Sequence, residues 1–250
     1  MRDAVTLTGI VLSSAPSGEY DKRVVLLTKE RGKITAFARG ARRPHSALLA
    51  ATGVFAFGTF LLYEGKDAYS LVQANISKYF PELMNDFGGA YYGMYFCELA
   101  DYYTRENNDE LAVMKLLYQS LRALTNKALG RELVRYIYEL KLFTCVGEYP
   151  QVFGCTQCGS QENLEQFSMF HGGMVCKECR GKVKDGILMN PSTVYTMQYI
   201  VSIPVEKLYT FTVTPEVLSE LRMVMDRWRE RYLDKNMKSL EILESVKDIC

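Results

Sequence analysis

Two cysteine pairs constrain this chain more than any other feature. Each pair has the form Cys-x-x-Cys, Cys155 with Cys158 and Cys176 with Cys179, and seventeen residues separate the two pairs. This spacing is typical of a four-thiolate zinc site, in which two tight turns carry the ligands and a short hairpin brings them together. Four thiolates complete a tetrahedral zinc ion and leave no position for water or substrate, so we expect a structural metal.

Other interpretations of the cysteines remain open at this point. The four thiols could form two disulfides, and His171, inside the same hairpin, could replace one ligand. Three further cysteines, Cys97, Cys145 and Cys250, have no evident partner, and free thiols beside a thiolate site indicate a reducing compartment. No apolar run approaches the roughly 20 residues that span a bilayer. We therefore expect a cytoplasmic protein with no membrane partner.

The first 80 residues alternate with the two-residue period of β-strands. We expect strands at residues 4–14, 23–28, 34–39, 54–63 and 67–76, separated by turns rich in glycine and polar residues. In the fourth strand we expect one shared side for Phe55, Phe57, Thr59, Leu61 and Tyr63. Five short strands indicate a small barrel; we expect an OB-type barrel, although the strand count also fits an SH3-like barrel.

From Glu82 onward the apolar residues follow the three-and-four spacing of helices. Three helices are expected before the cysteine hairpin and two or three after it, with a strong start at Thr214-Pro215-Glu216. The predicted fold class is thus α+β: an N-terminal five-stranded OB-type barrel, then a helical domain interrupted by a four-cysteine zinc ribbon. The predicted domains are the barrel at residues 1–80, a first helical part at 81–150, the ribbon at 151–186 and a second helical part at 187–250.

Charge is distributed unevenly, although the net charge is only +1. Between residues 22 and 43 there are eight basic side chains and one acidic one, Glu30. The basic residues are Lys22, Arg23, Lys29, Arg31, Lys33, Arg39, Arg42 and Arg43. Such a strip on a barrel suits phosphate binding, because each neutralised phosphate releases condensed counterions. We predict DNA binding here; an ordinary solvated face is the alternative. The nearby aromatic residues are expected to fill the barrel more than to stack on bases; they are Phe37, Phe55, Phe57, Tyr63 and Tyr69.

No catalytic constellation is apparent. The chain has only two histidines, and neither a P-loop nor a dinucleotide-binding glycine pattern occurs. We expect a protein that is not an enzyme. A zinc-dependent nucleic-acid enzyme and a zinc-stabilised protein–protein scaffold that does not bind DNA are the competing hypotheses.

Several segments together resemble the RecO family of bacterial recombination mediators. They are residues 27–33 (LTKERGK), residues 38–43 (ARGARR), residues 135–142 (RYIYELKL) and the segment 172–179 that ends in the second cysteine pair. Residues 50–55 depart from the family pattern, which usually has leucine and proline there.

The resemblance implies an OB barrel that binds single- and double-stranded DNA and anneals complementary strands. It also implies that the protein acts together with RecR and contacts the acidic C-terminal tail of single-stranded DNA-binding protein. By the same resemblance, the protein would help to load the RecA recombinase on DNA. An acidic tail needs a cation beside an apolar pocket, and we predict Arg131 and Arg135 as that partner-tail site.

Overall fold

The computed structural model describes residues 4–247, without the side chains of residues 246 and 247, so Cys250 lies outside the described residues. The chain packs as two units. One extends to Asn126 and takes in the segment from Met237 onward, and the other is Lys127–Asn236. Within the described residues, no helix is long and apolar enough to cross a membrane.

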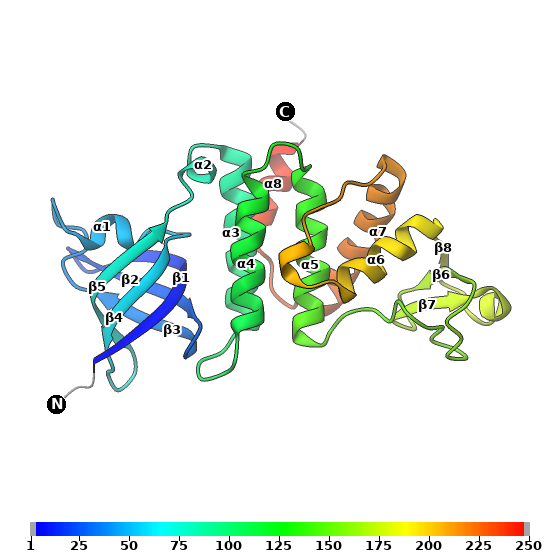
Figure 1. Ribbon diagram of the computed structural model, residues 1–250, viewed down its shortest axis with the longest axis horizontal. Coiled ribbons are helices and arrows are strands. Elements are labelled where there is room, and N and C mark those ends of the chain that lie inside the picture. Colours follow the sequence, from blue (N-terminus) through cyan, green and yellow to red (C-terminus); the bar gives the residue numbers. More distant parts are fainter. Residues whose placement is uncertain (1–3, 248–250) are drawn as a thin grey trace. The chain divides into compact units, whose positions relative to one another are not determined.

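Five strands of the first unit form a closed barrel (Figure 1). Neighbouring strands follow the order β1-β2-β3-β5-β4; β3 and β5 run parallel, and the other pairs are antiparallel. The strands are β1 Ala4–Ser17, β2 Asp21–Thr28, β3 Gly32–Ala38, β4 Phe57–Tyr63 and β5 Tyr69–Lys78. Leucine, valine, isoleucine, alanine and aromatic side chains fill the interior. The predicted number of strands is confirmed.

Phe57, Thr59, Leu61 and Tyr63 share one side of β4, as predicted, and this side faces away from the barrel interior. Gly58, Phe60 and Leu62 are buried toward the interior, whereas Thr59 and Tyr63 are exposed. The strand begins at Phe57 and not at residue 54. Apolar residues occur on both sides of this strand because Phe57, on the outer side, packs against a helix, so the alternation alone did not identify the interior.

Helices complete the first unit. They are α1 Leu48–Ala51, α2 Pro81–Met84, α3 Phe87–Tyr103, α4 Leu111–Leu124 and α8 Lys238–Lys247. The ring of Phe57 lies 4.7 Å from that of Tyr118 on α4, centroid to centroid, which attaches the barrel to this helix. Ser239 at the start of α8 donates its hydroxyl to Glu98 on α3 at 2.9 Å. The short helix α1 was not predicted from the sequence.

The second unit contains helices and a small sheet. The helices are α5 Arg131–Val146, α6 Pro191–Ser202 and α7 Pro215–Tyr232, with 3-10 turns η1 Lys177–Lys182 and η2 Val205–Lys207. The sheet has the order β7-β6-β8, with β6 Leu164–Ser168, β7 Gly173–Cys176 and β8 Gly186–Leu188. Trp228 of α7 is buried edge-on to Phe167 of β6 and donates its indole N–H to the Glu148 carbonyl at 2.8 Å. The sheet is thereby packed onto the helices of its own unit.

Local sequence signals explain the helix ends of this unit. The hydroxyl of Thr214 accepts a hydrogen bond from the N–H of Val217, and Pro215 occupies the first turn of α7, as predicted. α5 ends at Gly147, whose φ of +80° is the left-handed conformation that suits glycine.

Candidate nucleic-acid interface and metal centre

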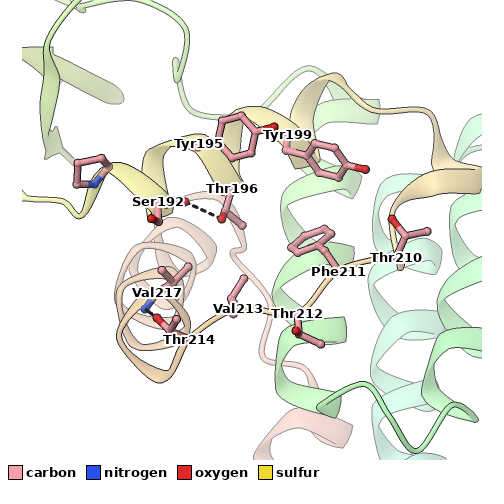
Figure 2. Close-up of a pocket in the computed structure, with 11 residues that line it drawn as sticks. Ser192, Tyr195, Thr196, Tyr199, Thr210, Phe211, Thr212, Val213, Thr214 and Val217 are labelled. Carbon is pink, nitrogen blue, oxygen red and sulfur yellow. Dashed lines mark hydrogen bonds between the residues drawn. The ribbon is translucent and has the colours of Figure 1, made fainter.

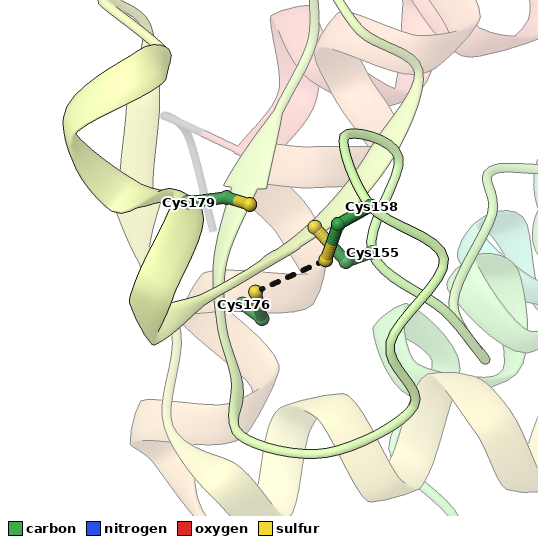
Figure 3. A group of neighbouring side chains, drawn as sticks. All are labelled: Cys155, Cys158, Cys176 and Cys179. Carbon is green, nitrogen blue, oxygen red and sulfur yellow. Dashed lines mark hydrogen bonds between the residues drawn. The ribbon is translucent and has the colours of Figure 1, made fainter.

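The four cysteines of the two Cys-x-x-Cys pairs form one cluster. Cys155 and Cys158 lie in a turn before β6, Cys176 ends β7, and Cys179 lies in η1. Their sulfur atoms all lie within 4.8 Å of one another and point toward a common centre (Figure 3). All four thiols are free, so the disulfide alternative is wrong in this structure. The arrangement is suited to hold one metal ion.

Backbone groups shape the first pair of thiols. Gly159 donates its N–H to the Cys155 carbonyl at 2.8 Å and has a φ of +78°, which closes the turn. Burial opposes ionisation of the Cys155 thiol, but backbone N–H groups, including that of Gln157, point at its sulfur and lower its pKa to about 6. Burial raises the pKa of the Cys176 thiol.

An apolar layer surrounds the cluster. Val175 is fully buried against the cysteines, and Leu164 and Val183 pack around it. Only Cys158 of the four is exposed. Such a setting limits water at the sulfur atoms and favours a closed site over one that admits substrate.

The predicted basic strip divides into two groups at opposite ends of a hairpin. β2 and β3 pair so that Arg23 lies opposite Phe37 at one end and Thr28 opposite Gly32 at the other. With a rise of about 3.3 Å per residue, the ends are roughly 20 Å apart.

The first group, the open-end cations, consists of Lys22, Arg23, Arg39, Arg42 and Arg43. Arg23 and Arg39 are exposed and have no ion-pair partner among the described residues. The Arg42 guanidinium donates to the carbonyls of Gly18 and Glu19 at 3.4 and 3.2 Å. Arg43 lies over the ring of Tyr20, 5.4 Å from its centroid.

Lys22 differs from its neighbours because its ammonium group is engaged. It donates to the carbonyl of Leu49 and the hydroxyl of Thr52, both at 3.1 Å. Burial, and then the nearby Arg42 guanidinium, lower the pKa of Lys22. The four arginines are therefore the cations available for a polyanion at this end.

The second group, the hairpin-tip cations, consists of Lys29, Arg31 and Lys33. The Lys33 ammonium contacts the Asp101 carboxylate at 3.1 Å, and Arg31 lies 3.9 Å from Glu64. Lys29 is exposed, but Glu30 is its neighbour in the chain. Carboxylates therefore balance most of the positive charge at this end.

Exposed aromatic rings accompany the open-end cations. Across the outer face of the barrel, strand pairing brings Arg23 beside Phe37, Phe37 beside Ser70 and Ser70 beside Tyr63. Phe37 and Tyr63 are 37% and 38% exposed, and Tyr20 is also exposed. The expectation that Phe37 and Tyr63 fill the interior is wrong. The same expectation is confirmed for Tyr69, which is buried.

The two arginines predicted for the partner tail have different surroundings. Arg131 is half-buried at the start of α5, where other groups of the chain contact it. Arg135 is only 1% exposed, and its guanidinium binds Glu139 at 2.8 Å and Asp226 at 2.9 Å. Burial argues against direct contact of Arg135 with a partner, so Arg131 is the better candidate.

Comparison with known proteins gives a uniform result. The family model described as "Recombination protein O N terminal" matches residues 1–80, and "Recombination protein O C terminal" matches residues 84–241. Curated relatives named DNA repair protein RecO align over nearly the whole chain. The protein of Alkaliphilus metalliredigens is 32% identical over 95% of this chain and 98% of its own length. Those of Acetivibrio thermocellus and Bacillus subtilis are 28% and 29% identical over 96% of this chain and 96% and 94% of their own.

Proposed function

This chain belongs to the RecO family of DNA repair proteins, and on that premise we propose that its barrel binds DNA through the open-end cations. The observation that supports this proposal is that four arginines lie at one end of the barrel beside exposed aromatic rings: Arg23, Arg39, Arg42 and Arg43. Arginine guanidinium groups bind phosphates, and exposed rings stack on bases, so the surface suits single strands and duplexes. Lys22 and the hairpin-tip cations Lys29, Arg31 and Lys33 take a smaller part, because other groups of the protein already bind most of them.

The barrel is proposed to be of the OB type. Five strands closed in the order β1-β2-β3-β5-β4, with a single parallel pair, support this assignment. OB barrels bind oligonucleotides on one strand face and the adjacent loops. The β1–β2 turn with Tyr20 and the loop after β3 with Arg42 and Arg43 are loops of this kind.

Strand annealing follows from the same surface. Two complementary strands repel each other through their phosphates, and a cationic face that screens both lowers the barrier to pairing without any covalent chemistry. We extend the proposal to loading of the recombinase on DNA coated with single-stranded DNA-binding protein. RecR and the acidic tail of that binding protein are the proposed partners, with Arg131 at the tail site. No catalytic residue is assigned.

The cysteine cluster is proposed to hold a structural zinc ion. With Zn–S bonds of about 2.3 Å, a tetrahedral site places sulfur atoms about 3.8 Å apart. The Cys158 and Cys176 sulfur atoms are 3.7 Å apart, which supports the fit. Zinc would be held by Cys155, Cys158, Cys176 and Cys179 and would join the first turn to β7 and η1.

An annealing assay tests the proposal. Two complementary fluorescently labelled oligonucleotides are mixed with the wild-type protein or with an Arg39→Glu/Arg42→Glu/Arg43→Glu variant. The matched control is Lys115→Glu/Lys127→Glu/Lys207→Glu, which changes net charge equally at exposed positions outside the barrel. We expect the first variant to lose annealing and the control to retain it. Equal loss in both, or in neither, would contradict the assignment, and absence of any DNA binding at low salt would favour the scaffold hypothesis.

A further inference from the structure

A groove of about 700 Å³ lies in the second unit, between α6 and the segment that leads into α7. Tyr195 and Tyr199 of α6 form one wall, and Phe211 and Val213 form the other (Figure 2). The Tyr199 and Phe211 rings meet edge to face, 5.3 Å between centroids. The Tyr195 side chain is 66% exposed, which is unusual for a large aromatic residue on a well-packed helix.

The segment at the second wall has the form of an unpaired β-strand. Residues 211–214 belong to no helix or strand, and their exposure alternates: Phe211 and Val213 are half-buried, whereas Thr212 and Thr214 are exposed. In Figure 2, Phe211 and Val213 point to the side of α6 and Thr212 points away. Within the described residues, the backbone N–H and C=O groups of 211–213 have no hydrogen-bond partner in the protein.

The lining is uncharged. It consists of aromatic rings, valine side chains, proline and the hydroxyl groups of serine and threonine, with no acidic or basic side chain. A phosphate or a carboxylate tail would find no cation in this groove. A chain with its own free N–H and C=O groups would find the complementary backbone groups of 211–213.

We propose that this groove binds an extended, uncharged segment of a partner protein. The segment adds as a strand beside residues 211–213 and places an apolar side chain between Tyr195, Tyr199 and Phe211. Backbone hydrogen bonds give affinity, and the aromatic wall selects the side chain, as in other cases of strand addition. The site differs in chemistry from the acidic-tail site proposed at Arg131.

Strand geometry provides a matched pair of variants. In an extended chain the N–H groups of successive residues point to opposite sides, so only one of the Thr212 and Val213 N–H groups can face an added strand. Proline removes the N–H and keeps an extended backbone. One of the variants Thr212→Pro and Val213→Pro should therefore weaken binding by about 2- to 10-fold, the range expected for one net hydrogen bond, and the other should not.

The probe is a set of eight-residue peptides from a random linear library, selected on the full chain and counter-selected on a Tyr195→Ala/Phe211→Ala variant. Synthetic copies carrying a fluorophore are then measured by fluorescence anisotropy in the absence of DNA. We expect apolar residues at alternate positions, affinity that salt does not change, and at least 10-fold weaker binding to Tyr195→Ala. Because Tyr195 is mostly exposed, this variant should fold, and circular dichroism verifies it.

Three results would overturn the proposal. The first is a selection that yields no peptide dependent on the groove. The second is equal affinity of the wild type and both proline variants for the selected peptides. The third is preference for acidic peptides with strong salt dependence, which would assign peptide binding to a charged surface elsewhere on the chain.

Discussion

The ammonium group of Lys33 donates to the backbone carbonyl of Asp101 at 2.5 Å and contacts the carboxylate of the same residue at 3.1 Å. This contact fastens the β2–β3 hairpin to the end of α3, and Lys33 is therefore engaged within the protein. Replacing Lys33 with Met should lower the free energy of unfolding by about 1 kcal/mol, because the hydrogen bond and the partly exposed ion pair are lost. Urea unfolding measures the change.

The DNA affinity of the Lys33→Met variant provides the control. We expect a change of less than about twofold, since Asp101 already neutralises the lysine. A large loss of affinity with unchanged stability would show instead that Lys33 is part of the DNA-binding surface.

Gly32 makes a second contact, between this hairpin and the loop that follows α3. Its φ is +63°, and a Cβ atom there would lie 2.3 Å from the Arg105 carbonyl oxygen. Gly32→Ala should therefore destabilise the protein by roughly 1–3 kcal/mol, combining backbone strain with a clash that rigid backbone cannot relieve. Gly18 is the matched control, because its φ is +66° and a Cβ atom there meets no atom within 4 Å. Similar unfolding midpoints for the two alanine variants would show that the contact with Arg105 does not matter.

Arg135 should stabilise the folded protein. Its guanidinium lies between Glu139, which is fully buried, and Asp226, so Arg135→Leu leaves a buried carboxylate without its main partner. We expect a loss of about 3 kcal/mol in urea unfolding, and a smaller loss for Arg135→Leu/Glu139→Leu, which removes both charges. Arg131→Ala should destabilise the protein less than Arg135→Leu does, and it should weaken binding of an acidic tail peptide in fluorescence anisotropy. An Arg135→Leu protein of normal stability would contradict the structural role.

Metal removal should affect the second unit and spare the barrel. We expect one zinc per chain by elemental analysis, and a chelator should lower the melting temperature by several degrees. Because thiolates bind the metal and thiols do not, the stabilisation is present at neutral and higher pH and is lost as protonation of the cysteines releases zinc at low pH. Cys176→Ser should reproduce the loss, and Cys145→Ser, outside the cluster, should not. Normal stability of Cys176→Ser with no bound zinc would exclude a structural metal.

Local patterns predicted the parts of this fold that depend on local chemistry. The spacing of Cys155 to Cys179 was sufficient to predict the cluster, and Thr214 with Pro215 was sufficient to predict the start of α7. Contacts between distant residues could not be predicted. Lys33 and Asp101 are 68 positions apart, and nothing in either segment indicates the other.

The basic strip illustrates the same limit. Its eight side chains are close in sequence, but the pairing of β2 with β3 places Lys29 and Arg39 at opposite ends of the hairpin. Charge density predicted a binding surface, whereas the strand register decides which cations share it. The groove at Phe211 gave no sequence signal, because an unpaired extended segment has the composition of an ordinary strand. The division into four domains and the roles of the predicted site residues stay predictions.

The salt dependence of single-strand binding tests the central claim most directly. The affinity of a labelled oligonucleotide is measured from low to moderate salt for the wild type, Arg39→Ala/Arg42→Ala/Arg43→Ala and the control Lys29→Ala/Arg31→Ala. Each lost phosphate contact flattens the log–log slope by about 0.7, so the triple variant should flatten it by about 2 and the control much less. An unchanged slope in the triple variant, or an equal change in the control, would contradict DNA binding by the open-end cations.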